Sequence, residues 1–315
     1  MSRLYEALRR MEKEQHPSGE NIAPEPPEPA QLLAGVLSEP IEFDHAPPAK
    51  IAVSATARLV ALTDPKSLGA EKFRALVMRL ESLRQQRELK CLQITSGVIN
   101  EGKTLVAANL ALTLAKHSGS KVLLVEGDLH RPALAALLGL SQLPGLTHWW
   151  TGQEPAIDRY LYRLDELPLW FLGAGTGCDQ PSQLLQSTRF TEAFTKLMGA
   201  FDWIVIDSTP ILPTVDANLW SRLVDGMLLV VREGVAPVKA LRGGLASLDN
   251  PKLIGVVLNE TSDFGHEDYG GQYNTRRDGD HHGHSPDGYR HLFEKAQAWL
   301  PAASRRRAAR LNKNK

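Results

Sequence analysis

The sequence predicts an α/β fold with three layers, α/β/α, in which helices cover both faces of a mostly parallel β-sheet. Between about residues 64 and 262, short apolar runs bounded by turn residues alternate with longer segments of helical periodicity. The apolar runs are nearly continuous, which is typical of parallel strands that are buried on both faces. A turn that contains two glycines also leads from the first of these strands into an apolar helix. Together these observations favour a helix-covered parallel sheet.

The apolar runs and the periodic segments place six strands and six helices in this region. The strands are expected at 92–95, 122–125, 169–172, 203–206, 226–231 and 253–258. The helices are expected at 69–87, 103–117, 132–138, 187–199, 215–222 and 237–248. None of the apolar runs approaches the length of about 20 residues that a membrane-spanning helix needs. We therefore expect no transmembrane segment, and any membrane association has to come through a partner or a peripheral surface.

The composition changes on both sides of residues 64–262, which we expect to form one globular domain. Residues 1–14 have the periodicity of a short amphipathic helix, either solvated or docked on another surface. Residues 15–63 contain two proline clusters and are expected to form a flexible linker. Residues 263–289 are rich in Gly, Asp, His and Asn, and the chain ends in a basic stretch, so we expect a flexible tail at 263–315.

Charge and cysteine content restrict the class of protein. The 315 residues include 36 basic and 36 acidic side chains, so the net charge of zero argues against a dedicated nucleic-acid-binding protein. The two cysteines, Cys91 and Cys178, match neither a disulfide framework nor a metal-binding spacing. The N-terminus has no secretory signal. We therefore expect a cytoplasmic protein.

The turn after the first predicted strand has the P-loop, or Walker A, pattern G-x-x-x-x-G-K-T in its strand–loop–helix context. Backbone N–H groups of such a loop and the positive end of the following helix bind phosphate oxygens. Lys103 is expected to reach the β- and γ-phosphates of ATP, and the Thr104 hydroxyl to bind Mg²⁺. The predicted cofactor-binding residues are Gly97, Val98, Ile99, Asn100, Glu101, Gly102, Lys103, Thr104 and Leu105.

Acidic residues follow two other predicted strands. Glu126 and Asp128 come directly after the strand at 122–125, and Asp207 directly after the strand at 203–206. The carboxyl ends of parallel strands form the edge where ligands bind in such sheets. Since side chains two residues apart on an extended chain project to the same side, both acids of the pair are expected to face the phosphates. The predicted metal ligands are Thr104, Asp207 and Asp128.

The pairing of Glu126-Gly-Asp128-Leu-His-Arg131-Pro with Asp207-Ser-Thr-Pro resembles the bacterial tyrosine kinases of capsule and exopolysaccharide synthesis, a branch related to the Min/Par-type ATPases. The similarity covers roughly residues 64–262 and includes Gly255-Val-Val-Leu-Asn259. Val98 stands where the P-loop of the Min/Par branch usually carries a lysine. The resemblance thus favours a P-loop tyrosine kinase over a nucleotide-switched Min/Par-like ATPase.

The resemblance implies transfer of the ATP γ-phosphoryl group to tyrosine, with Lys103 neutralising phosphate charge. It implies Asp128 as the general base, with Asp207 and Glu126 organising Mg²⁺ and its waters. Arg131 either neutralises the transferred phosphate or forms a structural ion pair. By analogy with the family, Asn259 is expected near the adenine.

The resemblance also implies tyrosine acceptors in a C-terminal tail, phosphorylated by a neighbouring subunit through self-association. The tail offers Tyr269, Tyr273 and Tyr289. A separate membrane adaptor of the polysaccharide co-polymerase type is the expected partner. It would hold the protein at the cytoplasmic side of the inner membrane.

Two features depart from the family pattern. Glu126 replaces the usual aspartate, and the extra methylene moves the carboxylate by about 1.5 Å. This change predicts slow catalysis or, in the extreme, a nucleotide-binding activator of the export machinery without strong kinase activity. The family's oligomerising helix carries a glutamate and two arginines at three-residue spacing. Here Glu71 and Arg74 are followed by Val77, with Arg79 as a partial substitute.

Overall fold

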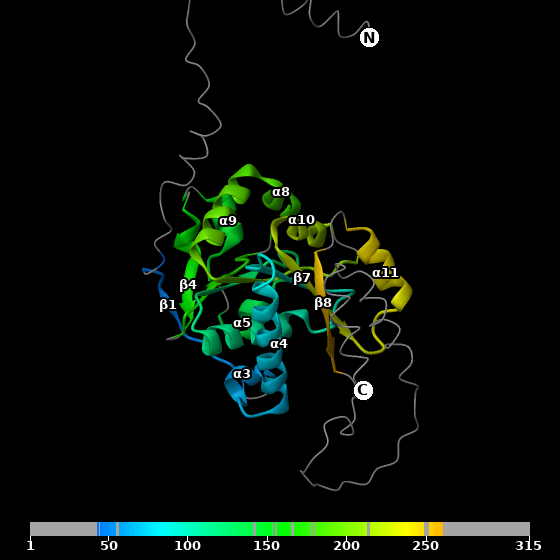
Figure 1. Ribbon diagram of the computed structural model, residues 1–315. Helices are drawn as coiled ribbons and strands as arrows, with labels where there is room; N and C mark the ends of the chain where they lie inside the picture. Colours follow the sequence, from blue (N-terminus) through cyan, green and yellow to red (C-terminus); the bar gives the residue numbers. More distant parts are fainter. Residues whose placement is uncertain are drawn as a thin grey trace, which may run out of the picture. The chain divides into compact units, whose positions relative to one another are not determined.

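The computed structural model describes residue 43 and residues 45–54, 57–140, 143–152, 154, 156–164, 167–176, 178, 180–212, 215–248 and 252–260. Its centre is an eight-stranded sheet with the strand order β1-β4-β5-β3-β6-β2-β7-β8 (Figure 1). Strands β2, β3, β5, β6, β7 and β8 are mutually parallel, whereas β4 pairs antiparallel to β5 and parallel to β1. The strands are β1 Pro48–Ala49, β2 Cys91–Ser96, β3 Val122–Glu126, β4 Leu161–Leu164, β5 Leu169–Leu172, β6 Trp203–Asp207, β7 Gly226–Arg232 and β8 Leu253–Asn259.

Helices cover both faces of this sheet, as the three-layer prediction requires. One face is covered by α3 Val60–Thr63, α4 Leu68–Arg84, α5 Lys103–Ser118 and α6 Leu134–Leu137. The other face is covered by α7 Leu146–Thr151, α8 Pro181–Gln186, α9 Thr188–Ala200, α10 Asp216–Leu223 and α11 Val238–Ala246. A 3₁₀ turn, η1 Ile157–Tyr160, precedes β4. None of the described helices is long and apolar enough to cross a bilayer.

The division into two faces follows from the alternation of side chains along each strand. In β3, Val122 and Leu124 pack into the core under α5, whereas Leu123 and Val125 pack into the core under α9 and α10. Helix α5 is apolar on nearly all sides and is buried from Val106 to Ala115, as expected for a helix that crosses the middle of a sheet. The sheet is therefore buried on both faces, and its ligand-binding side is the edge where the parallel strands end.

All six predicted strands and all six predicted helices are present, with boundaries that differ by a few residues. The structure adds elements that were not predicted: β1, β4, α3, α7, α8 and η1. Strand β4 was missed because it is short and carries the exposed Arg163, so that its sequence lacks a continuous apolar run. The other additions have at most six residues, too few to show a clear periodicity.

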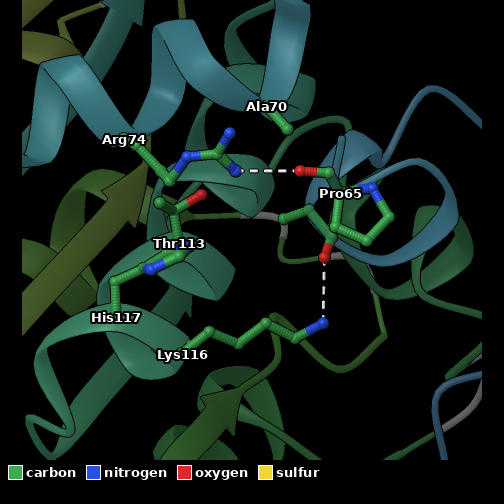
Figure 2. Close-up of a pocket in the computed structure, with 7 residues that line it drawn as sticks. Pro65, Ala70, Arg74, Thr113, Lys116 and His117 are labelled. Atoms are coloured by element: carbon green, nitrogen blue, oxygen red, sulfur yellow. Dashed lines mark hydrogen bonds between the residues drawn. The ribbon is translucent and has the colours of Figure 1, made fainter. Parts of the chain in front are cut away.

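The predicted linker at 15–63 requires a correction at its C-terminal end. Residues 45–63 contain β1 and α3, and Leu59 is fully buried among the residues under α4 and α5. Lys116 Nζ donates to the carbonyl of Ala61 (2.9 Å), and Arg74 Nη1 donates to the carbonyl of Pro65 (2.9 Å), as Figure 2 shows around a cavity of about 260 Å³. The apolar residues of this segment cover the outside of the core, which the proline content of the region concealed. The predicted helix at 1–14, most of the linker and the tail at 263–315 lie outside the described residues.

Candidate nucleotide and phosphoryl-transfer site

The predicted phosphate loop connects the end of β2 to the start of α5. Gly102 has φ +90°, and Asn100 has φ +64°, so the loop turns through two left-handed residues. A Cβ atom at Gly102 would lie 2.1 Å from Asn259 Nδ2, so the position combines a backbone conformation that favours glycine with a close approach of β8. The loop therefore delivers the N-terminus of α5, beginning at Lys103, to the carboxyl edge of the sheet.

Glu101 and Asn259 brace this loop from inside the protein. Glu101 is fully buried, and its carboxylate accepts hydrogen bonds from the backbone N–H groups of Val98 (2.8 Å) and Arg232 (3.3 Å). Asn259 Nδ2 donates to the carbonyl of Glu101 (2.9 Å). Asn259 therefore contacts the phosphate loop itself. Its expected position beside the adenine stays a prediction.

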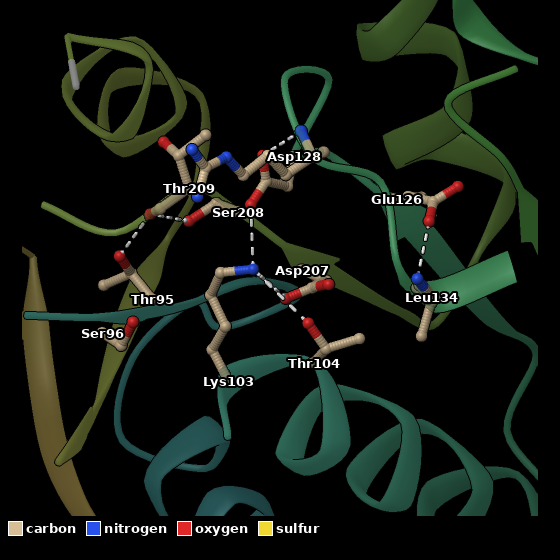
Figure 3. Close-up of polar contacts among 12 residues, drawn as sticks. Thr95, Ser96, Lys103, Thr104, Glu126, Asp128, Leu134, Asp207, Ser208 and Thr209 are labelled. Carbon is tan, nitrogen blue, oxygen red and sulfur yellow. Dashed lines mark hydrogen bonds and ion pairs between the residues drawn. The ribbon is translucent and has the colours of Figure 1, made fainter. Parts of the chain in front are cut away.

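Lys103 is the centre of the site. Its Nζ lies 2.9 Å from Asp128 Oδ2, 3.6 Å from Asp207 Oδ1 and 3.4 Å from Thr104 Oγ1 (Figure 3). Burial by itself would lower the pKa of Lys103, but the charges of Asp207 and Asp128 outweigh it and raise the pKa above the usual value. Lys103 thus stays protonated and joins the ends of β2, β3 and β6.

Asp207 carries the strongest electrostatic signature of a cation site. Its side chain is buried, and neither carboxylate oxygen has a hydrogen-bond partner among the residues that the structure describes. Burial raises the pKa of Asp207 to about 6, against the opposing effect of the Lys103 charge. The Lys103 ammonium group, 3.6 Å from Asp207 Oδ1, offsets this burial only in part, so a second cation would stabilise the carboxylate.

The donor set at this position fits Mg²⁺. The Asp207 carboxylate and the Thr104 hydroxyl are hard oxygen ligands, and both lie within reach of Lys103 Nζ. Within the described residues, no group of three or more His, Cys, Asp or Glu side chains could hold a metal ion. In nucleotide sites, Mg²⁺ binds through one or two protein ligands together with phosphates and waters, and Asp207 and Thr104 could supply two such ligands.

Glu126 and Arg131 lie differently from the expectation that they act with Asp128. The Glu126 carboxylate points toward Leu134 and away from Lys103 (Figure 3), and among the described residues it accepts hydrogen bonds only from backbone N–H groups. The Arg131 side chain is exposed and forms no ion pair with the described residues, although its backbone N–H donates to Asp128 Oδ1 (3.0 Å). Two acids at i and i+2 therefore do not share one site here: the Glu126 carboxylate faces N–H groups of α6 and Ala174, whereas the Asp128 carboxylate pairs with Lys103.

A polar contact beside the segment after β3 was not predicted from the sequence. His130 Nε2 lies 2.9 Å from Asp216 Oδ2, and Ser182 Oγ donates to Asp216 Oδ1 (2.8 Å). Asp216 is buried in the first turn of α10, so these contacts link the turn after β3 to α8 and α10. The only available signal was an acidic residue at the start of a predicted helix, where such residues are common.

The position of Val77 on α4 explains one departure from the family pattern. Val77 is 3% exposed and packs into the core, so an arginine at this position would bury its charge. Glu71 is exposed, and Arg74 donates to Pro65 in addition to a loose ion pair with Glu71 (3.8 Å). The acceptor candidates Tyr269, Tyr273 and Tyr289 lie outside the described residues.

Comparison with known proteins extends these observations. The chain is 30% identical over 214 residues to the tyrosine-protein kinase YwqD of Bacillus subtilis, a match that covers 67% of this chain and 90% of that kinase. It is 33% identical over 201 residues to the succinoglycan biosynthesis transport protein ExoP of Rhizobium meliloti, covering 62% of this chain and 25% of that protein. No protein-family model matches the sequence.

The solved structures give the same relationship at the level of the fold. The kinase domain of the Escherichia coli tyrosine kinase ETK superposes with a TM-score of 0.61 at 26% identity. The superposition covers 68% of this chain and 84% of that domain.

Proposed function

This chain belongs to the bacterial tyrosine-kinase family, and we propose that it transfers the γ-phosphoryl group of ATP to tyrosine hydroxyls. The observation that carries the proposal is the position of Lys103, between the phosphate loop and the two acids Asp128 and Asp207. Phosphoryl transfer requires little covalent chemistry from a protein, and it depends on positioning and on neutralising the charge of the transferred group. A lysine at the start of a buried helix, next to two acids, is positioned to neutralise that charge.

Each group at the edge of the sheet has a role in this proposal. The loop N–H groups and the N-terminus of α5 bind the phosphates, and Lys103 moves from its ion pairs to the β- and γ-phosphates. Thr104 and Asp207 would hold Mg²⁺, which would neutralise charge on the phosphate oxygens. The buried Asp207 carboxylate supports this assignment, because its ion pair with Lys103 at 3.6 Å does not offset its burial and a second cation would stabilise it further.

Asp128 is the proposed general base. Its Oδ2 atom pairs with Lys103, whereas its Oδ1 atom accepts the Arg131 N–H. When Lys103 turns to the phosphates, Oδ2 becomes free to accept the proton of an incoming tyrosine. The phenolic oxygen then forms the new P–O bond, the bond between the γ-phosphorus and the bridging oxygen breaks, and ADP leaves.

The tail and the cellular role extend the proposal. The acceptors are Tyr269, Tyr273 and Tyr289 of a neighbouring copy of the chain, and phosphorylation regulates capsular or exopolysaccharide synthesis. The name of the relative ExoP, a succinoglycan biosynthesis transport protein, supports this role. That relative is about four times as long as the matched region, since the match covers 25% of it. A membrane adaptor of the polysaccharide co-polymerase type is the proposed partner, as the resemblance to the kinases of polysaccharide synthesis implies.

The test is phosphotyrosine formation by the purified full-length chain with ATP and Mg²⁺, located by mass spectrometry. Replacing Lys103 by Met should lower the rate by about 100-fold or more, because one lost electrostatic contact in a transition state costs that much. Lys196→Met, on the exposed face of α9, is the matched control and should leave the rate unchanged. Hydrolysis of ATP without any phosphotyrosine would contradict the proposal and favour a nucleotide-switched ATPase instead.

A further inference from the structure

Glu126 is a buried acid whose hydrogen bonds within the described part of the chain are all with the backbone. It is 1% exposed, and three backbone N–H groups donate to its carboxylate: Leu134 (2.6 Å) and Ala135 (3.1 Å) to Oε1, and Ala174 (3.0 Å) to Oε2. A carboxylate can accept about four hydrogen bonds, so three such bonds leave little capacity for a metal or for water. In Figure 3 this group lies apart from the cluster around Lys103.

These bonds close a loop in the chain. Glu126 is the last residue of β3, and Leu134 and Ala135 begin α6, so the carboxylate joins the two ends of the segment 126–135, which we call the acid loop. The bond to Ala174 ties the same point to the segment after β5. That segment in turn accepts the backbone N–H of Thr147, at the start of α7.

Asp128 lies inside the acid loop and depends on its shape. The backbone of Gly127 is held on both sides, since its N–H donates to the carbonyl of Asp207 (2.8 Å) and its carbonyl accepts Trp220 Nε1 (3.1 Å). The Asp128 side chain is held by the Arg131 N–H and by Lys103. Two further contacts hold the loop: His130 Nε2 lies 2.9 Å from Asp216 Oδ2, and Glu126 fixes the return of the chain to α6.

The length of the Glu126 side chain matters for these contacts. An aspartate would withdraw the carboxylate by about 1.5 Å, one carbon–carbon bond. Hydrogen bonds of 2.6 to 3.1 Å do not survive such a withdrawal unless the backbone moves. A glutamine keeps the length but replaces one acceptor oxygen by an NH₂ group, which would face a backbone donor.

We propose that Glu126 is a positioning residue, which holds Asp128 in place through the acid loop and does not act on the metal. This proposal rests on the proposed kinase function, because Asp128 is the general base there. It reverses the expectation from the family pattern, in which glutamate at this position is a weakened catalytic acid. Instead, the length of the glutamate side chain allows its carboxylate to reach the N–H groups of Leu134, Ala135 and Ala174.

The first test compares Glu126→Asp and Glu126→Gln with the wild-type chain in phosphotyrosine formation. Both variants should lower kcat by about 10- to 100-fold, the cost of moving a catalytic group by about 1 Å. The KM for ATP and the Mg²⁺ concentration for half-maximal rate should stay within about 3-fold, because the phosphate loop is untouched. In an Asp128→Asn background, Glu126→Gln should change the rate by less than about 2-fold. If Glu126 acts through Asp128, the effects of the two substitutions are not additive.

The second test does not require activity. Hydrogen exchange of the free wild-type chain and the Glu126→Gln variant is followed at the amides of Leu134, Ala135 and Ala174, which should lose protection in the variant. Asp225→Asn is the matched control, because Asp225 accepts the N–H groups of Lys90 and Cys91 where β2 begins, at the opposite edge of the sheet. The control should alter exchange at Lys90 and Cys91 and leave kcat unchanged.

Three results would overturn the proposal: a Glu126→Asp variant as active as the wild type, a Glu126→Gln variant that needs over 10-fold more Mg²⁺ at unchanged kcat, or unchanged exchange at the three amides. Should Glu126→Gln fail to fold, Glu126→Asp carries the same measurements. Should the wild type form no phosphotyrosine, the proposed function fails while hydrogen exchange still decides whether Glu126 closes the acid loop.

Discussion

The phosphate loop and the acid loop meet at Lys103, and each is closed by a buried glutamate. Glu101 accepts N–H groups from its own loop and from the end of β7, whereas Glu126 accepts them from α6 and from the segment after β5. Both carboxylates therefore stabilise neighbouring loops by accepting hydrogen bonds from the backbone. Only one of the two, however, stands in a motif that suggests catalysis. The position of an acid at the edge of the sheet therefore does not decide whether its side chain faces a ligand or the backbone.

The largest expected effect concerns Asp207, which lies on β6 between the two loops and belongs to neither. Asp207→Asn should stabilise the free protein by up to about 3 kcal/mol at pH 7, because its pKa of about 6 lies about 2 units above that of an unfolded aspartate. The same variant should bind ATP with Mg²⁺ far more weakly, since the proposed cation ligand is lost.

The sign of the pH dependence is fixed by the raised pKa of Asp207. The folded protein binds the proton more tightly than the unfolded chain, so the wild type gains stability relative to Asp207→Asn as the pH falls from about 6 to about 4. Urea unfolding of both proteins without nucleotide from pH 7 to pH 4 measures the difference. A stability difference that does not change with pH would contradict the raised pKa. It would show that the charge of Lys103 fully offsets the burial of Asp207.

The next effect separates the two glutamates. Glu101→Ala should weaken ATP binding by about 10- to 30-fold, because the N–H groups of Val98 and Arg232 lose their acceptor and a lost buried partner costs about 1–3 kcal/mol. Glu126→Gln should leave the affinity within about 3-fold. Calorimetric titration with ATP and Mg²⁺ measures both, with Glu192→Ala on the exposed face of α9 as the control. Equal losses of ATP affinity in the two glutamate variants would contradict the different roles of the two loops.

The smallest effect concerns Asn259. Asn259→Ala should weaken ATP binding by about 5-fold, the value of one hydrogen bond of about 1 kcal/mol, here the bond to the carbonyl of Glu101. As a brace of the phosphate loop, Asn259 should affect tripolyphosphate and ATP by the same factor. A loss confined to ATP would place Asn259 at the adenine, as the family analogy expects.

The sequence predicted the long, strongly patterned elements well. The strand at 122–125 and the helix at 103–117 were found because continuous burial leaves an unbroken apolar signal. The short elements at 48–49 and 161–164 were missed, because β1 has only two residues, and β4, with four residues, is held between β1 and β5 by pairings that a short stretch of sequence does not reveal. Leu59 shows the same limit, because its burial against α5 depends on residues that are distant in the chain.

The sequence by itself determined that a phosphate loop follows β2 and that acids follow β3 and β6. These features depend on local spacing and on the rule that parallel strands end at one edge. Only the tertiary structure decided where each carboxylate points. Asp128 and Asp207 face Lys103, while Glu126 faces N–H groups from residues 8, 9 and 48 positions away. A side chain turns to the donors that folding brings beside it, and the spacing of residues along the chain does not record those donors.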